Sequence, residues 1–262
     1  MSNLPESSLR CDINGHCATI TIDNPPANTW TAASLQQLAQ LVEELEQNSA
    51  IYSLVLTGNG TKFFSAGADL TTFADGDKGT AATMAAAFGY AFETLAAFRG
   101  VSIAAINGYA MGGGLEVALA CDLRVVEQHA QLALPEASVG LLPCAGGTQN
   151  LTALVGEGWA KRMILLGERV GAQQAEHIGL AEAVVESGTA LHTAQTMAKL
   201  VEKQSPCSVR ACKQLIQAGR SMPRSQALPL ERELFVALFD TDDQQEGVSA
   251  FLEKRAPIWS NS

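Results

Sequence analysis

The chain has 262 residues, of which 47% are hydrophobic and 17% charged, which is typical of a globular protein of one or two domains. Its formal net charge is −10, and it contains no basic run. That charge argues against a nucleic-acid-binding surface or a surface that docks on an anionic membrane. No apolar run reaches the roughly 18 residues of a membrane-spanning helix.

The cysteines and the first residues indicate where the protein works. The six cysteines form no CxxC pair and no Cys/His cluster with zinc spacing, so we expect no metal site and reduced thiols. Residues Met1 to Arg10 are polar, lack an apolar core segment and are not arginine-rich. These features predict neither a signal peptide nor a transit peptide, and we expect a cytoplasmic protein.

Strands and helices mix in the first half of the chain. Alternating apolar and polar residues predict a strand over Cys17–Asp23, and apolar spacings of three and four predict a helix from Thr31. Aspartates and glycines between residues 75 and 79 indicate a mobile loop. Similar patterns predict further strands at Ile51–Leu56, Val101–Ile106 and Leu123–Val126, and further helices at Ala81–Phe98 and Leu115–Ala120.

Helices dominate after Cys144. They are predicted near Leu151 and over Trp159–Leu166, Ala172–Ile178, Ala190–Lys203, Val209–Ala218, Glu231–Phe239 and Gln245–Lys254, with one strand at Glu182–Val185. This order indicates α/β units followed by a helical part. We therefore expect one catalytic core with a C-terminal helical extension.

Two turns rich in small residues are candidates for binding an anion. Three glycines in the segment Met111–Glu116 separate a predicted strand from a predicted helix, where backbone N–H groups and the helix dipole favour negative charge. The turn Ala66–Asp69 follows another predicted strand and also presents a backbone N–H. The two turns could converge into an oxyanion hole. A tight strand-to-helix turn explains the glycines equally well, and Asp69 is better explained as a helix cap.

Glu116 and Glu136 are the candidate acid and base. Both lie among small or apolar residues, where loss of hydration raises the pKa of a carboxyl group. The alternative is that each is exposed or caps a helix. Cys144 could act as a nucleophile, although a small residue packed beside a helix start is the preferred interpretation.

Several segments together resemble the enoyl-CoA hydratase/isomerase (crotonase) family. They are Lys62–Leu70, Asn107–Glu116, Leu134–Glu136, Pro143–Gln149 and Glu246–Arg255, in the order and at the spacing of that family. The resemblance covers nearly the whole chain. It implies an α/β fold, the crotonase (ClpP-like) spiral of ββα units, over residues 1–195. It also implies a C-terminal helical trimerisation region over residues 196–262, and a homotrimer or a dimer of trimers.

The resemblance also implies an activity and its catalytic residues. The backbone N–H groups of Ala68 and Gly113 would hold the thioester oxygen, Glu116 would activate water, and Glu136 would protonate C2. The reaction would be the reversible addition of water to the 2,3 double bond of a 2-enoyl-CoA, with no cofactor besides the coenzyme A of the substrate. Having both glutamates favours a hydratase over an isomerase.

The resemblance assigns substrate contacts as well. Phe251 and Lys254 would reach the coenzyme from a neighbouring subunit, and Thr71–Phe92 would form part of the acyl pocket. This chain departs from the common family pattern at Cys144, at Asn150 and in the loop 25–28, which lacks a lysine. The full set of expected contacts is Pro26, Ala27, Asn28, Ala66, Gly67, Asp69, Leu70, Tyr109, Gly112, Pro135, Phe251 and Lys254.

Two other functions stay open at this point. One is a Δ3,Δ2-enoyl-CoA isomerase or another 3-hydroxyacyl-CoA dehydratase of the same family. The other is a catalytically idle scaffold that binds acyl-CoA or RNA. The net charge of −10 argues against RNA, and the two retained glutamates argue against an idle protein.

Overall fold

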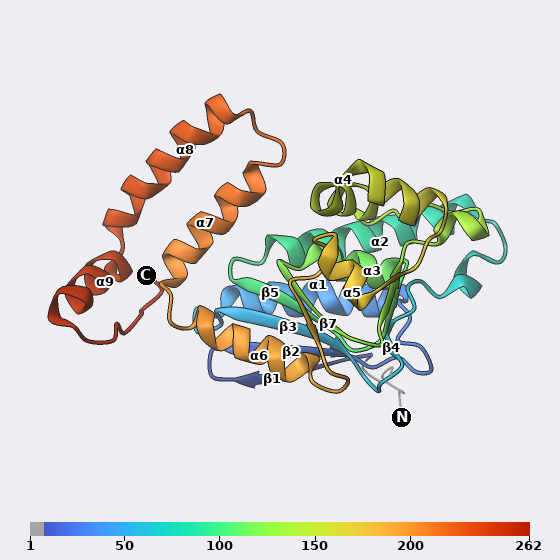
Figure 1. The fold of residues 1–262 in the computed structure, drawn as a ribbon, viewed down its shortest axis with the longest axis horizontal. Coiled ribbons are helices and arrows are strands. Elements are labelled where there is room, and N and C mark those ends of the chain that lie inside the picture. Colours follow the sequence, from blue (N-terminus) through green and yellow to red (C-terminus); the bar gives the residue numbers. More distant parts are fainter. Residues whose placement is uncertain (1–7) are drawn as a thin grey trace.

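The computed structural model describes residues 8–262, which form two β-sheets with helices packed around them (Figure 1). The larger sheet has the strand order β1-β2-β3-β5-β7-β10. Strands β1 and β2 form an antiparallel hairpin, and the remaining neighbours are parallel. The strands are β1 (Leu9–Asn14), β2 (Cys17–Ile22), β3 (Ser53–Gly58), β5 (Val101–Ile106), β7 (Leu123–Glu127) and β10 (Ala183–Val185).

The smaller sheet has the order β4-β6-β8-β9, in which the first three strands are parallel. Its members are β4 (Phe63–Ser65), β6 (Tyr109–Met111), β8 (Gln131–Ala133) and β9 (Val170–Gly171). One strand in each sheet and then a helix recur three times, as β3-β4-α2, β5-β6-α3 and β7-β8-α4. The helices are α2 (Lys78–Ala97), α3 (Gly113–Ala120) and α4 (Gly147–Leu165). This arrangement is the expected spiral of ββα units.

The spiral brings three distant turns together. Because β4, β6 and β8 are parallel neighbours, the turns that follow them lie at the same edge of the smaller sheet. These turns contain residues 66–69, 112–113 and 134–136. Every candidate catalytic residue lies in one of them or in the first turns of α3.

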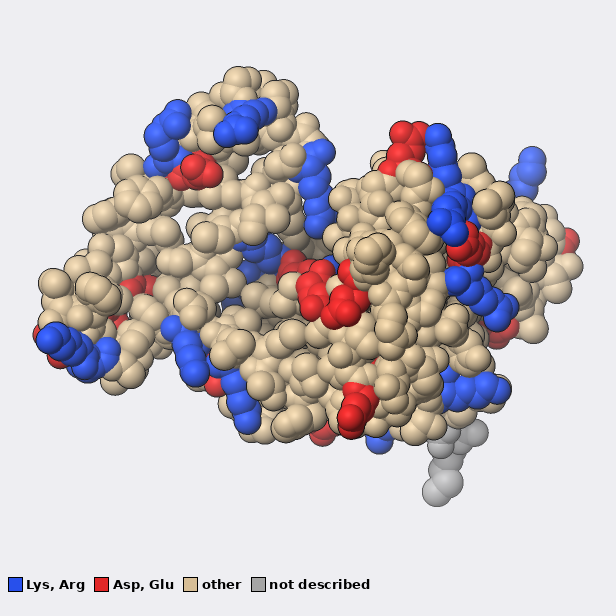
Figure 2. Space-filling model, in the orientation of Figure 1, with Lys and Arg blue, Asp and Glu red and all other residues tan. Residues whose placement is uncertain are grey.

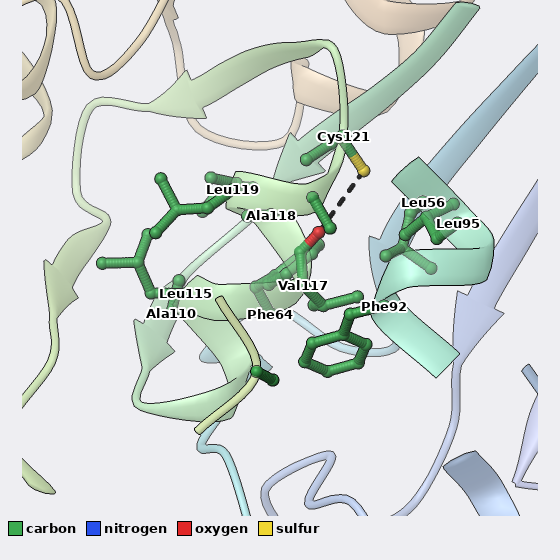
Figure 3. Packing of buried hydrophobic residues seen from close by; sticks show 14 of the residues in the cluster. Leu56, Phe64, Phe92, Leu95, Ala110, Leu115, Val117, Ala118, Leu119 and Cys121 are labelled. Carbon is green, nitrogen blue, oxygen red and sulfur yellow. Dashed lines mark hydrogen bonds between the residues drawn. The ribbon is translucent and has the colours of Figure 1, made fainter. Parts of the chain in front are cut away.

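Helix α3 lies at the centre of the apolar core, where all eight of its residues are buried. Figure 3 shows it beside side chains from β3, β4 and α2, among them Leu56, Phe64 and Phe92. Helix α1 (Ala32–Gln47) packs against α2 and starts where the sequence predicts, after a reciprocal cap between Thr31 and Ser34. The core therefore fixes α3 from all sides.

The predicted elements differ from the structure in a few places. The segment expected as a loop at residues 75–79 contains the cap Asp77, whose side chain accepts a hydrogen bond from the Thr80 N–H, so α2 begins at Lys78. The two helices expected near Leu151 and over Trp159–Leu166 are the two halves of α4, which are separated by the non-helical residue Gly156 (φ 76°, ψ 164°). Strands β1, β4, β6, β8 and β9 were not predicted.

The last helices leave the body of the molecule. Helix α6 (Ala190–Val201) packs its alanines against the larger sheet, whereas α7 (Pro206–Ala218), α8 (Arg224–Ala237) and α9 (Asp242–Glu253) project away (Figure 1). The expected boundary between residues 195 and 196 falls inside α6, and the division into two regions stays a prediction. Helix α5 (Ala172–His177) and the 3₁₀ turns η1 (Leu70–Phe73), η2 (Glu136–Val139) and η3 (Leu238–Asp240) complete the fold.

None of the helices within residues 8–262 has the length and apolar character needed to cross a bilayer. In the same part of the chain, no three His, Cys, Asp or Glu side chains are grouped as metal ligands would be. On the face shown in Figure 2, lysine and arginine side chains are spread over both the body and the helical extension.

Candidate active site

A cavity of about 180 Å³ lies where the three turns meet. Both candidate glutamates and both candidate N–H groups border it. Residues from η1, α2 and the segment after η2 complete the wall. The lining residues are Ala66, Ala68, Leu70, Phe73, Phe88, Met111, Gly112, Gly113, Glu116, Pro135, Glu136, Ser138, Val139, Leu141, Leu142 and Cys144.

The turn after β4 holds the Ala68 N–H in a fixed position. On either side of Ala68, the Trp30 N–H donates to the Gly67 carbonyl at 2.8 Å and the Asp69 N–H donates to the Trp30 carbonyl at 3.1 Å. Trp30 is fully buried, so this clamp is rigid. Gly67 has a φ of 90°, a conformation that favours glycine.

The turn after β6 supplies the second N–H group. A side chain on Gly67 would lie 2.7 Å from the Met111 carbonyl oxygen and 3.1 Å from the Gly113 nitrogen, so the two turns nearly touch. Gly113 is the first residue of α3, where an N–H has no partner inside the helix. Across residues 8–262, the N–H groups of Ala68 and Gly113 make no hydrogen bond. They form a pair of free donors of the kind that an oxyanion hole requires.

Glu116 is buried and held by the start of α4. Only 3% of the residue is exposed, and its Oε1 accepts hydrogen bonds from the N–H groups of Ala145 at 2.8 Å and Gly147 at 2.9 Å. Burial raises the pKa of Glu116 above its ordinary value, and these N–H groups, together with that of Cys144, offset only part of the rise. The donors and the helix N-terminus therefore stabilise the ionised form at this position.

Glu136 differs from Glu116 in having no hydrogen-bond partner for its carboxyl group in the described residues. Both of its carboxyl oxygens are shielded from solvent, and neither has a hydrogen-bond partner among the described residues. Burial, followed by the charge of Glu116, raises the pKa of Glu136 to about 7. One cavity thus holds a carboxyl group whose ionised form is hydrogen-bonded and another that stays protonated up to neutral pH. Such a pair can act as base and acid at the same time.

The loop 26–28 lies beside the turn after β4, as expected for a shared coenzyme site. The Ala66 N–H donates to the Ala27 carbonyl at 2.9 Å. The Asn28 side chain is buried and donates to the carbonyls of Asn59 and Phe63, so its amide holds the loop in place. Pro26 is exposed at this surface. A coenzyme contact from Pro26, Ala27 or Asn28 stays a prediction.

Several of the other expected substrate contacts lie at or beside the cavity. Ala66, Leu70, Gly112 and Pro135 line the cavity, and Gly67 shapes the turn beside it. The Asp69 side chain accepts hydrogen bonds from the N–H and hydroxyl of Thr71 and caps η1, the role preferred from the sequence.

Three more of the expected contacts lie away from the cavity. Tyr109 is at the start of β6 against Phe63 and is not part of the cavity wall. Phe251 belongs to α9 and Lys254 caps its C-terminal end, at the far end of the helical extension in Figure 1. Phe251 is 82% exposed. Neither residue can reach the cavity of its own chain in this conformation.

Sequence reasoning missed two groups of site residues. The N–H groups of Ala145 and Gly147 fix Glu116, and the glycine pair in the segment Pro143–Gln149 was the available signal for them. The segment 138–142, which forms one wall of the cavity, has no motif that marks it. Phe73 and Phe88 do lie in the stretch Thr71–Phe92 that was expected to form part of the acyl pocket.

Comparison with known proteins agrees with this geometry. The family model for enoyl-CoA hydratase/isomerase matches residues 12–262. A 2,3-dehydroadipyl-CoA hydratase from Escherichia coli (strain K12) is 40% identical over 91% of this chain and 92% of its own length. A short-chain-enoyl-CoA hydratase from Clostridium acetobutylicum is 35% identical over 92% of this chain and 93% of its own length.

Solved structures agree as well. The structure of Pseudomonas aeruginosa DspI is 61% identical, with a TM-score of 0.95 over 98% of this chain and 99% of that one. An enoyl-CoA hydratase from Bacillus anthracis is 33% identical, with a TM-score of 0.94 over 97% of this chain and 100% of that one. The fold is the crotonase fold, and the chain belongs to the enoyl-CoA hydratase/isomerase family.

Proposed function

We propose that this protein is an enoyl-CoA hydratase that adds water reversibly across the 2,3 double bond of a 2-enoyl-CoA. The observation that carries this proposal is the pair Glu116 and Glu136 in one cavity, of which, among the described residues, only Glu116 has hydrogen-bond donors that stabilise its ionised form. Coenzyme A enters as part of the substrate.

The two free N–H groups bind the thioester oxygen. When water adds to C3, the electrons of the double bond move through C2 onto this oxygen and form an enolate. The fixed donors at Ala68 and Gly113 bind the enolate oxygen more strongly than the neutral carbonyl, which lowers the barrier. Because Trp30 clamps the Ala68 turn, the donors need no rearrangement during the reaction.

The glutamates carry out the two proton transfers. Glu116, held as a carboxylate, takes a proton from the attacking water while the water oxygen bonds to C3. Glu136 gives its proton to C2 of the enolate. After one turnover the proton has moved from Glu136 to Glu116, and the water that binds next returns it. No proton is gained or lost overall.

A hydratase fits better than an isomerase because both glutamates border the cavity. An isomerisation needs one group that moves a proton between carbons, whereas hydration needs a second group to activate water. The two curated relatives described above are both named as hydratases.

Homotrimers, or dimers of trimers, are part of the same proposal. The projecting helices α8 and α9 expose large apolar side chains, including Phe235, Phe251 and Leu252. Such a surface favours contact with another subunit. In that assembly Phe251 and Lys254 would approach the coenzyme bound by a neighbour, where the lysine would supply a cation that the loop 25–28 lacks.

The direct test follows the loss of enoyl-thioester absorbance with crotonyl-CoA. We expect rapid hydration by the wild-type protein, and a loss of roughly 10²–10⁴ in turnover for either Glu116→Gln or Glu136→Gln, the usual effect of removing a positioned acid or base. Wild-type exchange of the C2 proton in Glu136→Gln would contradict its assigned role. Turnover of 3-enoyl-CoA without hydration would instead support the isomerase.

A further inference from the structure

We propose that the cavity selects an enoyl-CoA whose acyl chain is an uncharged hydrocarbon and discriminates against a chain that ends in a carboxylate. This inference rests on the proposed function and concerns the part of the substrate beyond C3. It follows from the side chains of the wall and from the charge that the reaction requires in the cavity.

The wall beyond the two glutamates is apolar. Leu70 and Phe73 of η1 line it together with Phe88 of α2. Val139, Leu141 and Leu142 line it as well, and these three side chains are partly exposed to solvent. An alkyl chain buried among these side chains gains roughly 0.8 kcal/mol for each methylene removed from water.

The cavity offers no partner to a second carboxylate. Within residues 8–262, no lysine, arginine or histidine lines the cavity. The Ser138 hydroxyl donates to the Pro135 carbonyl at 2.7 Å, and the N–H groups of Ala68 and Gly113 are engaged by the thioester oxygen. The thiol of Cys144 is a weak donor. A terminal carboxylate would therefore lose its hydration without gaining hydrogen bonds.

The charge of the catalytic pair adds to this penalty. Glu116 and Glu136 must carry one negative charge between them for the reaction to start. The end of a six-carbon acyl chain lies a few bonds from C3, about 6 Å from that charge. At an effective dielectric constant near 20, this repulsion alone corresponds to roughly 10- to 100-fold in the rate constant kcat/KM.

This inference separates the chain from one of its relatives. The relative that is 40% identical is named as a 2,3-dehydroadipyl-CoA hydratase, a name that describes an acyl group with a terminal carboxylate. Family membership therefore does not fix the acyl end group.

The experiment compares two substrates of equal chain length, trans-2-hexenoyl-CoA and 2,3-dehydroadipyl-CoA, under the same conditions. We expect kcat/KM to be at least about 10-fold higher for hexenoyl-CoA. Equal values, or a preference for dehydroadipyl-CoA, would overturn the inference while leaving the hydratase proposal intact. If the protein hydrates neither of these substrates nor crotonyl-CoA, the proposed function itself fails.

A charge placed on the wall tests the cause. Leu142 is 68% exposed at the rim, so a longer side chain can be accommodated there. We expect Leu142→Arg to raise the ratio of dehydroadipyl-CoA to hexenoyl-CoA activity at least about 5-fold over Leu142→Gln, with the gain shrinking as salt is added. The Gln variant controls for lost apolar surface.

A second pair of variants, Leu70→Arg and Leu70→Gln, repeats the comparison at another lining residue. This pair replaces the first if the Leu142 variants do not fold. Thermal melting of each pair identifies a variant that does not fold. An equal ratio in the Arg and Gln variants of a folded pair would show that wall charge does not set the preference, and would overturn the inference.

Discussion

Glu116 and Glu136 differ in their hydrogen bonds more than in their burial. Glu116 accepts two N–H groups at the start of α4, whereas the oxygens of Glu136 have no partner in the described residues. The sequence alone shows the two glutamates and their apolar neighbours. The link between Glu116 and its donors is not visible in the sequence, because the donors are backbone N–H groups some thirty residues further along the chain and only a glycine pair marks their segment.

The pH dependence of hydration follows from this pair. The pair must hold one proton, so we expect a bell-shaped kcat/KM profile whose alkaline limb lies near pH 7, where Glu136 loses its proton. The dehydration profile must coincide, because the reaction exchanges no net proton with the solution. A wild-type profile that stays flat between about pH 6 and pH 9 would rule out this assignment.

Stability should depend on pH through the same residue. The pKa of Glu136 is raised from 4.5 to about 7 on folding, so the unfolded chain ionises first, and stability falls as the pH rises between these values. Above pH 7 the buried charge destabilises the fold by roughly 1–2 kcal/mol after allowance for solvent screening. Glu136→Gln should therefore raise the melting temperature at about pH 8, with little effect near pH 4.5.

The turn after β4 shows how an element positions a single N–H group. Gly67 has a φ of 90°, and a side chain there would lie 2.7 Å from the Met111 carbonyl. We expect Gly67→Ala to push the two turns apart and to lower kcat by roughly 10²–10³, the usual effect of losing an oxyanion-hole donor.

Gly60→Ala is the matched control for that change. Gly60 has a similar φ of 83°, but nothing lies within 4 Å of the position of an added side chain. The Gly60→Ala variant should therefore be destabilised by the strained backbone conformation but should keep wild-type kcat. A Gly67→Ala protein with wild-type kcat would refute the role of this turn.

At the level of elements, the sequence predicts long segments better than short ones. Helices α1, α2 and α6 have an apolar face that repeats over several turns, and β5 is apolar except for Ser102. Strands β4, β6 and β8 have only three residues each, too few for a period to be visible. These short strands matter most to the site, because the turns that hold its residues follow them directly. Only the family resemblance indicated these strands.

At the level of the whole molecule, the exposed apolar side chains of the helical extension support the proposed assembly. Lys213 of α7 fixes its base, since its Nζ donates to the carbonyls of Phe98 and Gly100 and forms a 2.7 Å ion pair with Asp122. Beyond that point α8 and α9 expose Phe235, Phe251 and other apolar side chains to solvent. A monomer would leave this apolar surface in contact with water.

We therefore expect light scattering coupled to size-exclusion chromatography to give the mass of a trimer or of a multiple of three chains. Lys254→Glu should raise the KM for acyl-CoA several-fold with little change in kcat, because it removes a cation far from the reacting carbons. Lys203→Glu, on the body side of α7, is a control of equal charge change. A monomeric mass with full activity would contradict the assembly.

The hydrogen bonds from Ala145 and Gly147 to Glu116 also set the order in which a newly made chain becomes an enzyme. A ribosome-bound chain that ends before residue 145 already contains both oxyanion turns and Glu116, but has no donor for the Glu116 Oε1. Glu116, the proposed general base, is oriented only when α4, the last helix of the three repeats, has been synthesised and has docked. A nascent chain released at residue 140 would carry most of the site residues and no competent base.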